Sequence, residues 1–383
     1  IARCNNMKIL TLVERRADYS RMRPILKELY KDSFFEIYLI VTGVCLLDEH
    51  GKDIDYIKED GFTINAEVPM FEEVSVNTNT SMVRALAKVL DGVTTEIENY
   101  KPDLVLTGFD IGANFATTIA AAHMNIPVAH IQGGEVTGSI DESIRHAMSK
   151  FSHIHFPATE DARSRLIRLG ENPNCVFNVG CPSIDTIVQT PVIGKGFLEK
   201  KFNIDFSKPV ILLIQHPVTT ESCESKKQIL NTISVIKDLG IQALIALPNN
   251  DAGSSDIIDE IKKSGLSWYP SLSTEEFVNI YRNIWAIVGN SSSGIHESST
   301  FGIPAVNIGT RQQDRESAAN VINTGYRRTE IKSGISKALF DKEFRKNIKN
   351  IKNPYGVGNS SKKIVSILKT ISLDNIVQKR FYE

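Results

Sequence analysis

The sequence has few cysteines, no long apolar run and almost no net charge, and each shortage excludes a class of protein. Its 383 residues include five cysteines, without a Cys-x-x-Cys pair, which argues against a disulfide framework or a zinc ribbon and indicates reduced thiols. No apolar stretch approaches the ~20 residues that a membrane-spanning helix requires, so we expect no membrane partner. With 44 basic and 45 acidic residues, the formal net charge is -1, which gives no reason to expect a nucleic-acid partner.

Two common nucleotide-binding patterns are also missing. No G-x-G-x-x-G follows the first expected strand, Lys8–Val13, and no G-x-x-x-x-G-K-[ST] occurs. These absences argue against a dinucleotide enzyme and a P-loop nucleotidase. The apolar run Ile9–Val13 is too short for a secretory signal, and Met7 resembles a natural start, so we expect a cytoplasmic location.

Short apolar runs alternate with helical patterns along the whole chain. The runs are apolar at every position, as in strands buried on both faces, and the alternation predicts parallel sheets covered by helices. The clearest expected strands are Lys8–Val13, Glu36–Val41, Leu104–Leu106, Val128–Ile131, His153–Pro157, Val210–Ile214, Gln242–Ala246, Ala286–Val288 and Ala305–Asn307. Expected helices include Tyr19–Tyr30, Thr80–Asn99, Asn114–Met124 and Ile140–Lys150.

The pattern restarts near the middle of the chain. A stretch from 189 to 209, with two prolines and two glycines, is typical of a crossover between domains. We therefore predict an α/β protein of two Rossmann-like domains, residues 1–187 and 188–361, with a cleft between them. A last helical segment within 362–383 is expected to return to the first domain.

The stretch from 285 to 316 has the pattern of an anion site. The strand-like run Trp285–Val288 is followed by the small residues Asn290–Gly294, and a helical pattern opens at Ile295. Unpaired N–H groups at a helix start and nearby hydroxyls bind phosphate, and guanidinium groups add paired hydrogen bonds. A carboxylate one turn further on could accept bonds from a sugar hydroxyl pair. The candidate residues are Ser291, Ser292, Glu297, Arg311 and Arg315. A polar loop between two strands is the alternative.

The stretch from 130 to 150 is the densest in ionisable groups. A strand ends at Ile131, a Gly-Gly turn follows, and the spacing of Ser139 and Glu142 predicts a capping box for a helix that starts near Ile140. His130, Glu135, Asp141, Arg145 and His146 should crowd this strand end. Glu135 and Asp141 suit acid–base chemistry. A capped helix with surface ion pairs is the alternative, and it would account for Glu142 and Arg145.

Three more candidates follow strand ends. Asp110 lies in a turn before a helix, where capping is an equal alternative to catalysis. His216 leaves the strand Val210–Ile214 at the presumed ligand edge. Arg16 follows the first strand and could reach a diphosphate across the cleft, with Asp18 or Ser20 as a helix cap. Its neighbours Arg15, Arg21 and Arg23 are expected to be solvated.

Five motifs together resemble the hydrolysing UDP-N-acetylglucosamine 2-epimerase family of the bacterial sialic- and legionaminic-acid type. They are Arg16–Ser20, His130–Ala147, His216–Glu221, Asn290–Glu297 and Gly309–Glu316, in the expected order. The resemblance implies a GT-B fold with the active site in the cleft and a C-terminal helix that crosses back. It also implies a UDP-sugar as partner, a homodimer or homotetramer, and no metal or other cofactor.

The resemblance implies a two-stage reaction on UDP-N-acetylglucosamine. A base removes the C2 proton while UDP leaves C1, and water then adds to the glycal to give N-acetylmannosamine. The resemblance implies catalytic roles for Asp110, Asp141 and His216, and we add Glu135 as a catalytic candidate. It implies nucleotide contacts for Arg16, Ser291, Ser292, Glu297 and Arg311, with Glu297 on the ribose. We add Ser20, Gln132 and Arg145 as substrate-binding candidates.

Two departures from some relatives point to a different sugar. Gln132 stands where they have a catalytic Glu, so Glu135 would carry that function or Gln132 would only hold the substrate. The turn Gly108–Ile111 lacks an Arg that they have. The same reaction on UDP-N,N'-diacetylbacillosamine, for legionaminic acid, is therefore the second interpretation. A GT-B glycosyltransferase and a catalytically silent nucleotide-sugar sensor are the others.

Overall fold

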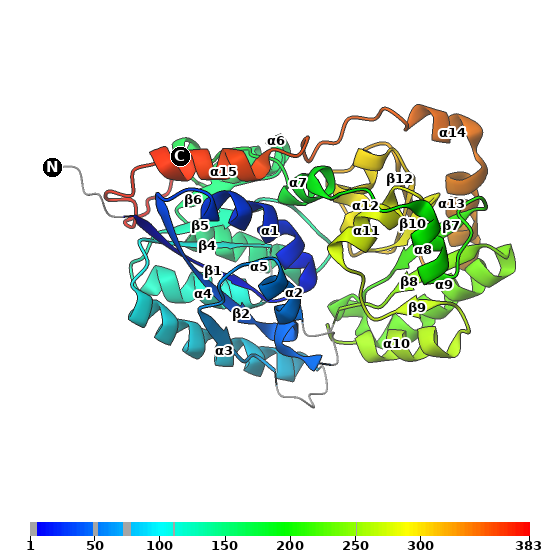
Figure 1. The fold of residues 1–383 in the computed structure, drawn as a ribbon, viewed down its shortest axis with the longest axis horizontal. Coiled ribbons are helices and arrows are strands. Elements are labelled where there is room, and N and C mark those ends of the chain that lie inside the picture. The colour runs from blue at the N-terminus through cyan, green and yellow to red at the C-terminus, as the bar shows by residue number, and fades with distance from the viewer. Residues whose placement is uncertain (1–5, 49–52, 72–77, 110–111, 250) are drawn as a thin grey trace.

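Two lobes, each built around one sheet, lie side by side (Figure 1). The structure is a computed structural model that describes residues 6–48, 53–71, 78–109, 112–249 and 251–383. The strands of the first lobe are β1 (Met7–Val13), β2 (Phe35–Thr42), β3 (Ala66–Val68), β4 (Leu104–Gly108), β5 (Val128–Ile131) and β6 (Ile154–Phe156). Those of the second lobe are β7 (Val210–Ile214), β8 (Gln242–Ala246), β9 (Trp268–Tyr269), β10 (Ala286–Gly289), β11 (Ala305–Ile308) and β12 (Val321–Thr324).

Both sheets have the same topology. Their orders are β3-β2-β1-β4-β5-β6 and β12-β11-β10-β7-β8-β9, and the paired strands are parallel. Counted from the first strand of each lobe, both orders are 3-2-1-4-5-6, the Rossmann arrangement. The predicted α/β class with two Rossmann-like halves, a GT-B fold, is confirmed.

Helices cover the sheets and explain why the strands are apolar at successive positions. In β1, Ile9 and Val13 belong to the cluster that includes side chains of α1 and α15, whereas Leu10 and Leu12 belong to the cluster that includes α3 and α4. The helices of the first lobe are α1 (Arg16–Tyr30), α2 (Asp53–Glu59), α3 (Asn79–Tyr100), α4 (Gly112–His123), α5 (Ile140–Phe151), α6 (Glu160–Arg168) and α7 (Pro182–Gln189). The later helices are α8 (Lys195–Phe202), α9 (Ser225–Leu239), α10 (Ser254–Lys263), α11 (Thr274–Tyr281), α12 (Ser293–His296), α13 (Arg328–Phe340), α14 (Lys342–Asn347) and α15 (Ser360–Thr370).

The chain passes between the lobes twice. It leaves the first lobe after α7, and α15 returns to pack on α1 and α7 (Figure 1). The Asp185 carboxylate of α7 accepts the backbone N–H groups of Ser360 at 2.9 Å and Ser361 at 2.8 Å, which caps α15. The exact domain boundaries stay a prediction. Within the described ranges, no helix has both the length and the apolar character that crossing a membrane requires.

Three short strands were not expected from the sequence: β3, β9 and β12. Each lies at or next to a sheet edge and is largely half-buried or exposed, so it lacks the continuous apolar run of a central strand. The helix expected to open at Ile295 is only the four-residue α12, followed by a 3-10 turn at Ser298–Phe301.

Candidate active site

Two cavities adjoin in the cleft, at the carboxyl ends of strands from both sheets, where ligands of open α/β proteins bind. The first has a volume of about 240 Å³ and the second about 210 Å³. Their shared lining is Arg16, Ala17, Arg21, His216, Leu247, Ser291 and Ser292. The first also contains Gln132, Glu135, Asp141, Arg145 and Arg311 of the predicted site, and the second contains Ser20 and Glu297. Asp110 lies outside the described residues.

Gln132 and Glu135 form an oriented pair at the end of β5. Gln132 has a positive φ of 58°, which turns the chain sharply into the Gly-Gly segment. Its Nε2 donates to Glu135 Oε1 at 3.0 Å, while its buried Oε1 has no partner among the described residues. The amide therefore offers a hydrogen-bond acceptor to a ligand in the first cavity.

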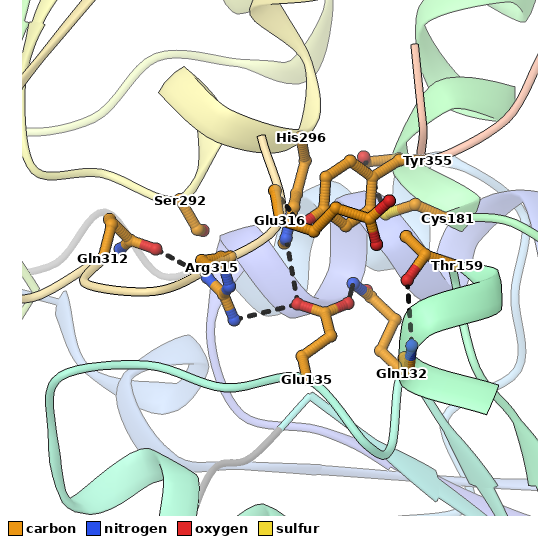
Figure 2. A network of polar contacts seen from close by, with 12 residues as sticks. Gln132, Glu135, Thr159, Cys181, Ser292, His296, Gln312, Arg315, Glu316 and Tyr355 are labelled. Atoms are coloured by element: carbon orange, nitrogen blue, oxygen red, sulfur yellow. Dashed lines mark hydrogen bonds and ion pairs between the residues drawn. The ribbon is translucent and has the colours of Figure 1, made fainter. Parts of the chain in front are cut away.

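The Glu135 carboxylate faces cationic and polar groups of the other lobe (Figure 2). Arg315 Nη2 lies 3.0 Å from Oε2, and His296 Nε2 lies 3.1 Å from the same oxygen. Burial alone would raise the pKa of Glu135, but the charge of Arg315 and the contact with His296 outweigh it and hold the pKa well below its usual range. Glu135 is therefore a fixed negative charge between the lobes.

Asp141 projects into the first cavity from the first turn of α5. Its carboxylate is 32% exposed and lies 3.8 Å from Arg311 Nη2. The expected capping box is wrong in detail: Ser139 Oγ accepts the Asp141 N–H at 3.3 Å, and Glu142 accepts the Thr137 N–H at 2.7 Å. The Glu142 side chain therefore bonds the backbone N–H of Thr137 and not the backbone N–H of Ser139, because the segment before α5 bends back toward it.

Arg145, on the same helix, is almost fully buried and is not a surface partner of Asp141. Its Nη1 donates to the Glu135 carbonyl at 2.9 Å, which ties α5 to the Gly-Gly segment. His130 is buried and contacts Ser149 Oγ at 3.2 Å, and His146 lies 3.9 Å from Glu142. Neither histidine lines the two cavities. Of the five ionisable residues expected at this strand end, only Glu135, Asp141 and Arg145 line the first cavity.

His216 is fixed at the exit of β7. The backbone N–H of His216 donates to Asn290 Oδ1 at 2.7 Å, and the ring Nδ1 contacts Asn249 Oδ1 at 3.0 Å. Burial, with the nearby charge of Arg311, lowers the pKa of His216 well below its ordinary value. The described contacts of the ring use Nδ1, so a neutral imidazole can offer Nε2 to a ligand.

The serine turn after β10 and the carboxylate beyond it line the second cavity. Ser292 Oγ accepts from Arg21 Nη2 at 3.1 Å, and Arg311 Nη1 donates to the Asn290 carbonyl at 3.3 Å. Glu297 is buried, its pKa is raised by burial, and its Oε2 has no partner in the described part of the chain. Apolar side chains complete this cavity: Ile187, Ile214, Leu272, Phe277 and Val278.

The arginines after β1 differ from the expectation. Arg16 pairs with Asp53 and donates to the Leu272 carbonyl of the other lobe at 3.0 Å. Arg15 and Arg21 line the first cavity, and the guanidinium of Arg23 pairs with Asp60 and Glu275, so the expectation that all three are solvated is wrong. The start of α1 faces the opposite lobe, which local periodicity does not reveal. Neither Asp18 nor Ser20 caps it: Asp18 pairs with Arg15, and Ser20 Oγ donates to the Ala17 carbonyl.

A third cavity of about 700 Å³ shares Arg15 and Asp141 with the first. Much of its wall is apolar. The apolar side chains are Met70, Met82, Val83, Leu86, Phe115, Ile140 and Ile144. A substituent that extends past Asp141 would therefore enter a cavity with both apolar and polar walls.

Comparisons with known proteins identify the family of the chain. The sequence pattern of the UDP-N-acetylglucosamine 2-epimerase family matches residues 27–369. A UDP-N,N'-diacetylbacillosamine 2-epimerase (hydrolyzing) of Legionella pneumophila is 36% identical over 370 residues, with 96% of each chain covered. A GDP/UDP-N,N'-diacetylbacillosamine 2-epimerase (hydrolyzing) of Campylobacter jejuni is 30% identical over 385 positions, which cover 98% of this chain and 99% of the relative.

The fold has a solved counterpart as well. The crystal structure of UDP-GlcNAc 2-epimerase from Neisseria meningitidis bound to UDP-GlcNAc matches with a TM-score of 0.83 at 23% identity, covering 95% of this chain and 100% of that one. The predicted enzyme class, a UDP-sugar 2-epimerase, is confirmed, and the chain belongs to the UDP-N-acetylglucosamine 2-epimerase family.

Proposed function

We propose that this enzyme hydrolyses a UDP-linked N-acetylated hexosamine and inverts the sugar at C2. The observation that carries the proposal is that Asp141 of the first lobe faces Arg311 of the second across the first cavity, 3.8 Å apart. A carboxylate able to exchange a proton thus stands beside a cation able to hold the departing diphosphate.

The second cavity suits the nucleoside. The Glu297 carboxylate can accept bonds from the two ribose hydroxyls, and Phe277 provides an apolar face for the uracil ring. Ser291 and Ser292 line both cavities and Arg311 lines the first, so all three can hold the diphosphate and stabilise the charge that develops on it.

The reaction then takes two steps. A base removes the C2 proton, the C1–O bond breaks, and its electron pair leaves with UDP, which creates a C1–C2 double bond. The oxygen of water then bonds to C1 while C2 receives a proton on the opposite face. We assign the proton transfers to Asp110 and Asp141, contact with the reacting centre to His216, and orientation of Gln132 to the charged Glu135. Arg16 and Arg145 hold the lobes and the α5 segment in place, and Ser20 lines the nucleoside end.

We propose UDP-N,N'-diacetylbacillosamine as the substrate. This sugar carries an acetamido group at C4 and a methyl group at C6, and the third cavity beside Asp141, whose wall is in large part apolar, offers room for both. The relatives of 36% and 30% identity, whose names specify that sugar, support the same choice. UDP-N-acetylglucosamine, with hydroxyls at both positions, is the second candidate. The product would serve sialic- or legionaminic-acid-type synthesis, and a cytoplasmic homodimer or homotetramer stays a prediction.

Incubation with each UDP-sugar in deuterated water tests the proposal. We expect UDP release without an acceptor, and a free sugar inverted at C2 with deuterium at that carbon by NMR. UDP release only in the presence of an acceptor would identify a glycosyltransferase. Binding of UDP without any turnover of either sugar would identify a sensor and contradict the proposal.

A further inference from the structure

The last residues of the chain form a strap on the first lobe, here defined as residues 371–383. Ile371, Leu373 and Ile376 are partly buried against the core around α1 and α15. The Tyr382 N–H donates to the Gly170 carbonyl at 3.0 Å. Figure 1 shows the C-terminus over the first lobe, beside α15. The strap is therefore held on the first lobe at several points, although many of its side chains are exposed.

Lys379 connects this strap to the end of α5. Its Nζ lies 2.8 Å from the Ser149 carbonyl, 3.0 Å from the Lys150 carbonyl and 2.7 Å from the Ser152 carbonyl. The last carbonyls of a helix have no partner within the helix, and they carry the negative end of its dipole. An ammonium group with three N–H donors satisfies both requirements, so Lys379 acts as a C-terminal cap supplied by a distant segment.

A buried carboxylate holds the Lys379 ammonium in this place. Glu171 Oε2 lies 2.5 Å from Lys379 Nζ and 2.9 Å from His155 Nε2, and Lys150 Nζ lies 2.8 Å from Oε1. Although burial alone would raise the pKa of Glu171, these contacts hold it at about 2. Burial lowers the pKa of Lys379 to about 8 against the attraction of Glu171, so both groups are charged at neutral pH.

The helix that Lys379 caps is the one that carries Asp141 to the first cavity. Asp141 and Ser149 are eight residues apart on α5, about 12 Å along one rigid helix. Arg145 and Ser149 also join α5 to the Glu135 carbonyl and to His130 of β5. A shift of the C-terminal turn would therefore move the first turn as well.

We propose that Lys379 is a positioning residue, through which the C-terminal strap fixes α5 and thereby the place of Asp141 in the cavity. This inference rests on the proposed function for its turnover readout only. A misplacement of about 1 Å at a reacting group can cost up to about 100-fold in rate. Of the proposed nucleotide contacts, Arg311 faces α5 through Asp141, whereas Ser291, Ser292 and Glu297 line the second cavity, which α5 does not line. Loss of the cap should therefore lower kcat and leave UDP affinity unchanged.

The test compares Lys379→Met, Lys379→Arg and the control Lys369→Met in the full chain. Lys369 is a second lysine near the C-terminus, pairs with Asp32 at 2.7 Å and is 43% exposed. We expect Lys379→Met to lower kcat about 10- to 100-fold with the Kd for UDP within about twofold, Lys379→Arg to recover most of the loss, and Lys369→Met to stay within about twofold throughout. A folded Lys379→Met enzyme with wild-type kcat would overturn the proposal, as would equal losses in kcat and UDP affinity.

Hydrogen exchange provides a readout that does not depend on turnover. In Lys379→Met, the amides of residues 146–152 should exchange faster, whereas those of α1 and α9 should not. Should that variant fail to fold, Glu171→Gln removes the counter-charge and should show the same exchange pattern with a smaller loss of kcat. Unchanged amide exchange at residues 146–152 in these variants would contradict the proposed role of Lys379. A wild-type chain that releases no UDP would contradict only the proposed function.

Discussion

Glu135 and Arg315 meet across the cleft, with 3.0 Å between carboxylate and guanidinium, and their side chains are 4% and 6% exposed. One partner follows β5 of the first lobe and the other follows β11 of the second, so this buried ion pair joins the lobes at the wall of the first cavity. Removing one partner of such a pair leaves an uncompensated charge.

We therefore expect Arg315→Met to destabilise the fold by about 3–5 kcal/mol in urea unfolding. The double variant Glu135→Gln/Arg315→Met should lose less than the sum of the two single variants, because neither charge is then left alone. Arg328→Met breaks an exposed pair with Asp238 and should cost at most about 1 kcal/mol. Additive losses in the double variant would refute direct coupling.

Asp141→Asn should reduce kcat by about 10²–10⁴-fold, because an amide cannot transfer the proton. UDP affinity, measured by calorimetry, should change far less, because Ser291, Ser292 and Glu297 line the second cavity, which Asp141 does not reach. Asp161→Asn on α6, whose exposed carboxylate pairs with Arg165, is the matched control and should behave like the wild type. Near-native turnover of Asp141→Asn would remove this residue from the mechanism.

Glu297→Ala should weaken UDP binding by about 1.5–3 kcal/mol, the range for hydrogen bonds to a charged group. The effect should appear in KM and in the Kd for UDP, with little change in kcat, because the ribose is remote from C1 and C2. An unchanged Kd would mean that Glu297 does not contact the nucleoside.

Leu86→Asn tests whether the third cavity selects the sugar. The amide places polar atoms in an apolar wall, so kcat/KM for the diacetylated sugar should fall roughly tenfold while that for UDP-N-acetylglucosamine stays within about twofold. Leu230→Asn, at a 38% exposed position on α9, is the control. Equal losses on both sugars would argue against selection by this cavity.

Glu14 should make stability depend on pH. Burial raises its pKa from 4.5 to about 7, so the folded state holds the proton more tightly than the unfolded state, and stability present below pH 4.5 is lost as pH rises through 7. The loss is about 3 kcal/mol. Glu14→Gln keeps an acceptor for the Ala113 N–H and cannot ionise. The difference in the free energy of unfolding between this variant and the wild type should therefore shift by about 3 kcal/mol in favour of the variant between pH 4.5 and 8. A constant difference would contradict the assignment; Glu160→Gln on the surface is the control.

Local pattern was enough for the central strands but not for contacts between lobes. The run Val210–Ile214 is apolar at every position and forms β7 with the predicted bounds, because burial on both faces leaves a local signature. Glu135 and His296 are 161 positions apart, and nothing local pairs them. Arg315 lies in a motif that the sequence singled out, four residues after Arg311, yet only the folded chain shows that it faces Glu135. The expectation that Arg21 is solvated is wrong because the periodicity of one helix carries no information about the residues of the opposite lobe.

The double passage of the chain between lobes determines how the cleft can open. Residues after α7 and residues before α15 form two parallel connections, and Asp185 fastens the second to the first lobe. With two connections side by side, the lobes can bend about one hinge axis, but twisting about the long axis of the molecule is resisted. We therefore expect the cleft to open by bending on the side away from α7 and α15.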